Sequence, residues 1–277
     1  MVLFTLALGT FRGTPEFTQS MTSYLNRTGA NRIGRLGQRA GLNVGGFCGV
    51  DRHVNQWRKL AVVIAFLMAC GCARSGFADG PVPPFKGHAD PAATSQDKSD
   101  KQTAVLAGGC FWGVDGVFSH VKGVTSVVSG YSGGDASTAQ YETVSSGTTG
   151  HAESVEITYD PKQISYSEIL RIYFSVATDP TELDRQGPDE GTQYRSVIFF
   201  ADPHQQAVAK DYIDQLDHAG VFSSAIVTEV VPLKQFYPAE AYHQNYLALH
   251  PDNPYIVYND LPKIDALKKE FPRVYKP

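Results

Sequence analysis

Residues 102 to 277 are predicted to fold as a single α/β (α+β) sandwich domain. Strand-like and helix-like stretches alternate along this part of the chain, an order typical of helices packed on a sheet. Apolar residues make up 42% of the sequence, which is ample material for a core. No internal repeat is visible.

The first half of the domain begins with a buried strand and a helix. A short apolar run ends in two glycines at "TAVLAGG", and "WGVDGVFSHV" then spaces its apolar residues as a helix does. "VTSVVSGY" predicts a strand, "YSGGD" a turn and "HAESVEITYDP" a strand of period two. Ser165, with Glu168 three residues on, has the capping-box pattern that opens a helix.

The second half continues the alternation. "YRSVIFF" predicts a strand, and Asp202 with Pro203 opens a helix that should run to His218 and stop at Gly220. Three further elements are expected: a strand at "AIVTEVVPL", a helix around "PAEAYHQNYLALH", and a short helix near Lys263 to Glu270 in an irregular tail.

The part of the chain before this domain is expected to be processing sequence. Arg58 and Lys59 precede an apolar stretch, Leu60 to Cys72, that is too short to span a bilayer but suits a signal peptide. We therefore divide the chain into an extension (1–53), a signal (54–78), a linker (79–101) and the domain (102–277). The extension is expected to be disordered or to reflect an over-extended start.

Export to the periplasm or cell envelope follows from the signal. Cleavage near Ala78 competes with lipid attachment at Cys70, because "LMAC" resembles the lipobox of bacterial lipoproteins. An organellar transit peptide, a cytoplasmic protein or a core helix of an N-terminal domain are the alternatives. The linker is expected to be unpacked, because it has almost no aliphatic residues.

The charge of the chain is unevenly distributed. Residues 1–78 carry nine Lys and Arg against two acidic residues, whereas residues 79–277 carry 15 against 26. A nucleic-acid binder needs a clustered basic surface, which an acidic domain does not offer. Nucleic acid is therefore excluded as a general partner.

Cys110 is the candidate nucleophile. It lies between the glycines of the predicted strand and the start of the next helix, whose free N–H groups favour a thiolate. Gly109 and Gly113 let the backbone approach a substrate, while Phe111 and Trp112 offer an apolar wall to a small alkyl group. A buried, inert cysteine is the alternative interpretation.

Glu153 is the candidate acid. Strand parity puts it on the same side as Val155, Ile157 and Tyr159, where burial would raise its pKa and keep it protonated near neutrality. A strand-end glutamate that reaches solvent is equally compatible with parity alone. The glycine-punctuated loop "GPDEGTQYRS" adds Asp189 and Tyr194 as polar groups.

Six motifs together resemble peptide methionine sulfoxide reductase of type A over about Ala107 to Tyr275: "GCFWG", "GYSGG", "GHAE", "YDP", "RQGPDEGTQYRS" and "YHQNYL". The resemblance implies a ferredoxin-like sandwich and reduction of the S epimer of methionine sulfoxide, free or in proteins. It implies that Cys110 attacks the substrate, that Phe111 and Trp112 hold its methyl group, and that Glu153 is the acid.

The resemblance further implies that Tyr141, Asp189 and Tyr194 support binding of the sulfoxide oxygen. Cys110 would become a sulfenic acid, and since no cysteine follows it, the chain should be of the one-cysteine type. The reductant would be a thioredoxin-like protein or a small thiol. The upstream Cys48, Cys70 and Cys72 are not expected to take part. The chemistry needs no metal or organic cofactor, and a monomer is expected.

Two other functions remain open at this stage. His151 of "GHAE", included among the candidate binding residues, could instead pair with Cys110 as in a papain-type hydrolase. An exported sulfoxide-binding or thiol-buffer module would bind without turnover. Thr178 departs from the family pattern, in which many relatives have a histidine before Asp-Pro, and this puts one local hydrogen bond in doubt.

Overall fold

The computed structural model describes residues 78, 80–87 and 101–277. The predicted extension, most of the signal and linker, and Cys48, Cys70 and Cys72 lie outside the described residues. Within the described ranges, no helix has the length and apolar character needed to cross a membrane.

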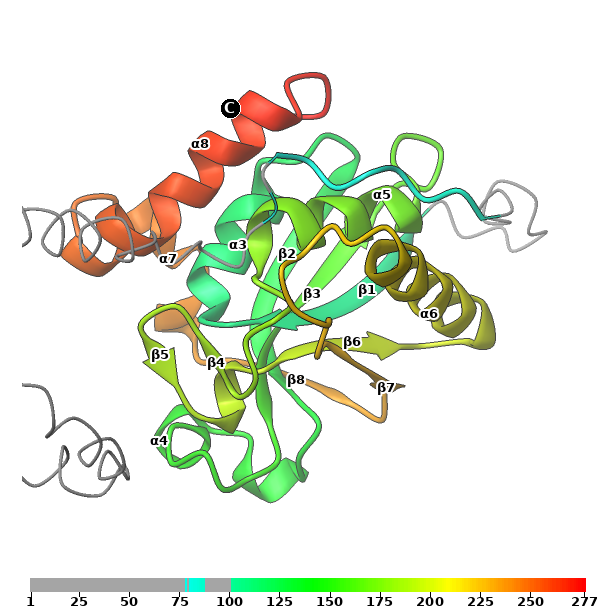
Figure 1. The fold of residues 1–277 in the computed structure, drawn as a ribbon. Coiled ribbons are helices and arrows are strands. Elements are labelled where there is room, and N and C mark those ends of the chain that lie inside the picture. The colour runs from blue at the N-terminus through cyan, green and yellow to red at the C-terminus, as the bar shows by residue number, and fades with distance from the viewer. Residues whose placement is uncertain (1–77, 79, 88–100) are drawn as a thin grey trace, which may run out of the picture. The chain divides into compact units, whose positions relative to one another are not determined.

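A six-stranded sheet with the order β7-β6-β1-β3-β2-β8 forms the centre of the domain (Figure 1). Neighbouring strands are antiparallel except β6 and β7, which are parallel. The strands are β1 (Gln102–Gly108), β2 (Val124–Ser132), β3 (Ala152–Tyr159), β6 (Ser196–Phe200), β7 (Glu229–Pro232) and β8 (Phe236–Pro238). With two helices, the four central strands follow a β-α-β-β-α-β order along the chain. The predicted mixed α/β class is confirmed.

The helices begin where the sequence predicts their caps. Ser165 Oγ accepts a hydrogen bond from the Glu168 N–H at 3.1 Å, and Asp202 caps its helix by accepting from the N–H groups of residues 204 and 205. The α-helices are α3 (Phe111–Ser119), α4 (Tyr141–Val144), α5 (Tyr166–Ile172), α6 (Pro203–His218), α7 (Tyr246–Leu249) and α8 (Leu261–Glu270).

Two features differ from the sequence prediction. The single helix expected around residues 238–250 is instead a 3-10 turn, η5 (Ala241–His243), and the short α7, because Asn245 between them has φ 54°. The polar loop that carries Asp189 contains a small hairpin of β4 (Arg185–Gln186) and β5 (Asp189–Glu190), which was not predicted.

The main core lies between one face of the sheet and helices α3, α5, α6 and α8. Leu106 of β1 pairs with Val155 of β3, and both are fully buried in this core. Residues of opposite parity, among them Val105 and Val197, form a smaller cluster on the other face. The two-residue alternation of the strands therefore separates the two sides of the sheet.

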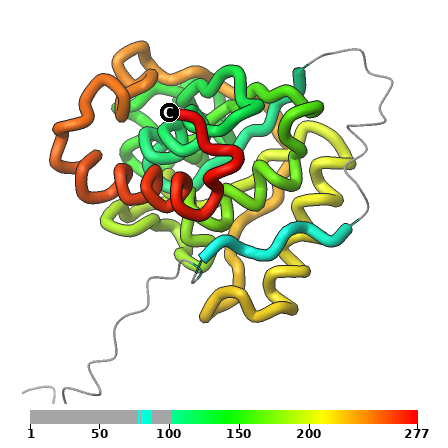
Figure 2. Tube along the Cα trace, turned by 90° about the horizontal axis from the view of Figure 1, so that it is seen from above, coloured from blue at the N-terminus to red at the C-terminus, as the bar shows by residue number. Residues whose placement is uncertain are grey.

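Residues 80–87 are docked on the domain, which corrects the prediction of an unpacked linker over that part (Figure 2). Val82 is fully buried, and its N–H donates to Ser175 Oγ at 3.0 Å. The carbonyl of Val82 accepts from Arg171 Nε, and that of Pro83 accepts from the Tyr212 hydroxyl. The composition of this segment does not predict its docking, because one buried side chain and backbone hydrogen bonds are enough to order it.

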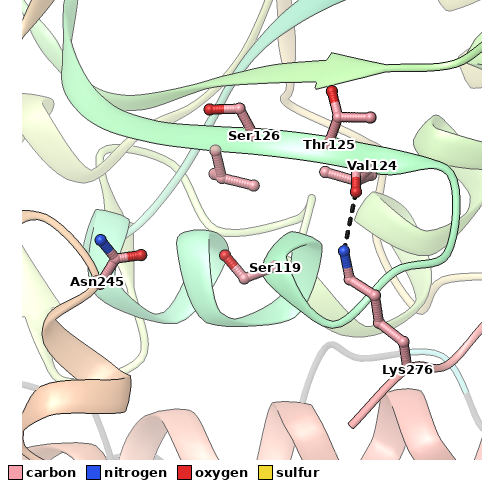
Figure 3. A pocket seen from close by; sticks show the side chains of 7 residues that line it. Ser119, Val124, Thr125, Ser126, Asn245 and Lys276 are labelled. Atoms are coloured by element: carbon pink, nitrogen blue, oxygen red, sulfur yellow. Dashed lines mark hydrogen bonds between the residues drawn. The ribbon is translucent and has the colours of Figure 1, made fainter.

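The C-terminal residues return to the end of α3. Lys276 Nζ donates to the Val124 carbonyl at 2.8 Å across a pocket that Ser119 and Ser126 also line (Figure 3). Tyr275 forms an isolated β-bridge with Val121. These contacts hold the tail against the helix that carries the candidate nucleophile.

Replacement of Val82 tests whether the docked segment is part of the folded domain. We expect Val82→Ala to lower the free energy of unfolding by about 2 kcal/mol, because it removes two buried methyl groups and leaves a cavity. Urea denaturation of the full chain measures the change. The matched control is Lys86→Ala, since that side chain is exposed and its N–H bond to Gln215 is kept. Equal stability of the two variants would contradict the docking.

Candidate active site

Cys110 is the N-cap of α3, directly after β1. The turn between them depends on Gly109, whose φ of 92° is a conformation that L side chains rarely adopt. A Cβ at residue 109 would also lie 2.5 Å from Gln186 Cγ. Residue 110 as a whole is partly buried.

The first turn of α3 also binds Glu153. The Phe111 N–H donates to Glu153 Oε2 at 3.0 Å, and only 3% of Glu153 is exposed. Burial raises the pKa of this carboxyl to about 8, although the Phe111 N–H opposes the shift. The parity prediction is therefore confirmed, and the alternative of a solvent-reaching glutamate is wrong. A neutral carboxylic acid at pH 7 can donate a proton.

The sulfur of Cys110 is held as a thiol in this environment. Burial raises its pKa well above the ordinary value, and the charges of Glu153, Asp260 and Asp189 raise it further. The Trp112 N–H, at the helix start, lowers the pKa but does not outweigh these effects. The expectation of a thiolate stabilised by the helix N-terminus is thus wrong for the resting site, because desolvation is the larger effect.

Trp112 is fixed from several sides by the C-terminal part of the chain. Its ring stacks on Tyr246 with centroids 3.8 Å apart and an interplanar angle of 9°. Its Nε1–H donates to His243 Nδ1 at 3.2 Å, and the ring of Tyr255 contacts it edge-on. An indole fixed in this way offers a rigid apolar surface next to Cys110.

The predicted polar groups converge on the same place. Burial raises the pKa of the Tyr194 hydroxyl, and the negative charges that Glu153, Asp189 and Cys110 carry at high pH raise it further. Burial, Glu153 and Cys110 raise the pKa of Tyr141 in the same way. Both tyrosines therefore stay protonated and can donate hydrogen bonds. Four segments that are distant in sequence supply these groups: α3, β3, the α4 turn and the β4–β5 loop with η4 (Thr192–Tyr194).

Several supporting residues were missed from the sequence. Glu240 accepts from the Tyr131 hydroxyl and from the Tyr141 N–H, each at 2.9 Å, and so fixes the turn that carries Tyr141. The Tyr255 hydroxyl donates a short hydrogen bond to Asp189 Oδ2. The motif "YHQNYL" marked the segment of His243 and Tyr246, but nothing in it specified contact with Trp112. No motif or pattern in the sequence indicated a role for Tyr255.

Two of the predicted binding residues have other roles in the structure. His151 is 1% exposed; its Nδ1 accepts from the Gly134 N–H at 3.2 Å, and its Nε2 lies 3.0 Å from the Asp135 carbonyl. Both nitrogens are thus used by a turn, so neither can activate Cys110 and the hydrolase pair is not formed. Gly113 is buried inside α3 and faces the carboxylate of Asp260.

Thr178, where the sequence departs from the family pattern, is fully buried against Gly108 and lies outside the group of catalytic candidates.

In the described part of the chain, no group of three or more His, Cys, Asp or Glu residues could hold a metal ion. The site therefore offers a thiol, a neutral carboxylic acid, two tyrosine hydroxyls and a rigid apolar wall. This set can attack an electrophilic atom and protonate an oxygen next to it.

Comparisons with known proteins identify the family of the chain. The family model described as Peptide methionine sulfoxide reductase matches residues 102–274. A "Peptide methionine sulfoxide reductase MsrA 2" of Mesorhizobium japonicum is 60% identical over 174 residues, which are 63% of this chain and 89% of the relative. A protein of the same name from Synechocystis is 50% identical over 182 residues, 66% of this chain and 84% of the relative.

A solved structure has a similar fold. Reduced Mxr1 from Saccharomyces cerevisiae is 32% identical, with a TM-score of 0.51 over 57% of this chain and 91% of that one.

Proposed function

Because the chain belongs to the peptide methionine sulfoxide reductase family, we propose that it reduces the S epimer of methionine sulfoxide to methionine, free or in proteins, through Cys110. The observation that carries this proposal is the pairing of Cys110 with a buried, protonated Glu153 on one helical turn. Reduction of a sulfoxide needs a nucleophile for its sulfur and a proton for its oxygen, and this turn supports both.

The apolar side of the site would orient the substrate. The methyl group of the sulfoxide packs against Phe111 and the fixed ring of Trp112, which places the substrate sulfur over Cys110 Sγ. Since Trp112 is held by Tyr246 and His243, little side-chain entropy is lost when the substrate binds. A rigid pocket for one methyl group favours a methyl sulfoxide over bulkier sulfoxides.

The polar side would accept the oxygen. Tyr141 and Tyr194, which stay protonated, donate hydrogen bonds to the sulfoxide oxygen, and Asp189 anchors the loop through Tyr255. Glu153 gives its proton to the oxygen as the Cys110 sulfur bonds to the substrate sulfur. The oxygen gains negative charge in this step, so donors that are already in place stabilise the transition state.

The step balances as a transfer of one oxygen atom. The sulfur–oxygen bond of the substrate and the transient bond between the two sulfurs break as the oxygen, now a hydroxyl, bonds to the Cys110 sulfur. Methionine leaves, Cys110 becomes a sulfenic acid, and the thiol proton of Cys110 replaces the proton that Glu153 gave. Cysteine is oxidised and the sulfoxide is reduced by two electrons. Two external thiol groups then reduce the sulfenic acid to the thiol, with release of water and formation of a disulfide.

The external reductant follows from the cysteine content. Cys110 is followed by no other cysteine in the sequence, so we infer a one-cysteine type whose sulfenic acid is attacked directly by a thioredoxin-like protein or a small thiol.

We also propose export of the domain, with the mature chain beginning between Cys70 and Asp79. The apolar stretch before these residues supports the proposal, and either processing site would leave the docked residues 80–87 on the domain. Sequencing the N-terminus of the purified native protein tests it. A first residue upstream of Arg58 would contradict export.

A single-turnover experiment tests the oxygen transfer itself. Without reductant, the full chain should release one methionine per Cys110 and carry one sulfenic acid on the peptide that contains it, both measured by mass spectrometry. Cys110→Ser should release none, because a hydroxyl is a far weaker nucleophile. A binding or thiol-buffer module would release no methionine in either form, and that result would refute the proposed function.

The pH dependence tests Glu153 as the acid. We expect kcat/KM of the wild-type protein to fall as the pH rises through about 8, because Glu153 then loses the proton that the sulfoxide oxygen needs. Glu153→Gln should lower kcat/KM roughly 100-fold and remove this fall.

The matched control for that variant is Glu156→Gln, on the same strand with the opposite parity. It should keep both the rate and the pH profile. A wild-type profile that is flat between pH 6 and 10 would exclude Glu153 as the acid.

A further inference from the structure

Asp260 is a buried carboxylate for which the proposed reaction has no use. It is fully buried, and within the described residues neither of its oxygens makes a hydrogen bond. The Lys263 ammonium lies 3.8 Å from Asp260 Oδ1. Asp260 ends a π-helical turn, η6 (Ile256–Asp260), and α8 follows at once, so the wider turn sets where the carboxylate points. An isolated buried charge is costly, so its neighbours are informative.

The carboxylate lies against the first turn of α3. A Cβ built on Gly113 would be 2.2 Å from Asp260 Oδ1 and 3.0 Å from Lys263 Nζ. Only glycine leaves room there, so the pair lies directly on the helical backbone that begins at Cys110. The N-terminus of a helix favours a negative charge, which helps this site to hold a carboxylate.

The charged and titratable groups around Cys110 and Asp260 come from each neighbouring element. They are Glu153 on β3, Asp189 on β5, Tyr141 on α4, Tyr194 on η4, Tyr255 before η6 and Lys263 on α8. Asp115, the carboxylate on α3 itself, accepts instead from Ser119 and Ser129. Burial raises the pKa of both Asp189 and Asp260, and the charge of Lys263 opposes this rise in each. In the described part of the chain, Lys263 thus faces several acids.

We propose that Asp260 and Lys263 are a pair of positioning residues that sets the net charge beside the Cys110 sulfur. The Asp260 carboxylate disfavours the thiolate, and Lys263 limits this effect by balancing the charge. Burial raises the pKa of Asp260 to about 6, so most of it is ionised at pH 7. The pair touches neither the substrate nor the reacting atoms and acts through the charge of Cys110.

The pair has a consequence for a protein that works under oxidising conditions. Oxidants attack the thiolate form of cysteine, and the further oxidation of a sulfenic acid is irreversible in most proteins. A carboxylate that keeps Cys110 as a thiol slows its oxidation when no substrate is bound. This protective role rests on the proposed function, whereas the effect of the charges on the Cys110 thiol does not.

Alkylation of Cys110 by iodoacetamide measures the thiolate directly, without the sulfoxide reaction. The full chain is labelled between pH 6 and 10, and the label on the peptide containing Cys110 is quantified by mass spectrometry. We expect Asp260→Asn to raise the alkylation rate at pH 8 about 10-fold, because removal of a negative charge near the thiol increases the fraction of thiolate. Lys263→Met should lower the rate by a similar factor. The double variant should return to within about threefold of wild type.

Asp265→Asn is the matched control, because Asp265 is exposed on the same helix and should leave the rate unchanged. Opposite effects of the two charge variants support the proposal. Rates equal to wild type in both, or changes in the same direction, would overturn it, and the second outcome would indicate a structural disturbance. If Asp260→Asn does not fold, the sign of the Lys263→Met effect decides. Methionine release, assayed separately, tests the proposed function, so the two can fail independently.

Discussion

The site depends on the first turn of α3, where backbone N–H groups that have no partner within the helix bind two buried side chains. The Phe111 N–H holds the carboxyl of Glu153, and the Trp112 N–H acts on the sulfur of Cys110. Such groups stabilise anions, yet burial here is strong enough to keep both the acid and the thiol protonated. The result is a neutral pair of proton-bearing groups, which is what a sulfoxide oxygen needs as it leaves.

The C-terminal segment completes this turn. Glu240 orders the loop of Tyr141, and Tyr246 fixes Trp112. Tyr255 anchors Asp189, and Asp260 places a carboxylate against Gly113. None of these residues is expected to react with the substrate. Their shared effect is to hold the groups of the site in place before the reaction, so that little rearrangement is needed when charge moves.

Some of these features could be predicted from the sequence because they are local. The alternation of the third strand put Glu153 on the buried face, and the capping pattern at Ser165 placed the start of a helix. Features set by tertiary contacts could not be predicted. The sequence allowed His151 as a base, but both of its nitrogens form hydrogen bonds within a turn. The composition of residues 80–87 predicted a linker, but Val82 is buried in the core. The thiol state of Cys110 depends on burial and on carboxylates more than 40 residues away in the chain.

The ionisation of Glu153 is the most direct test of the account. Carbon-13 NMR of the full chain, labelled at glutamate side-chain carboxyls and assigned by comparison with Glu153→Gln, gives the midpoint of this one group. We expect a midpoint near pH 8 for Glu153. A midpoint near the ordinary glutamate value of about 4.3 would mean that Glu153 is a carboxylate at pH 7 and has no proton to give.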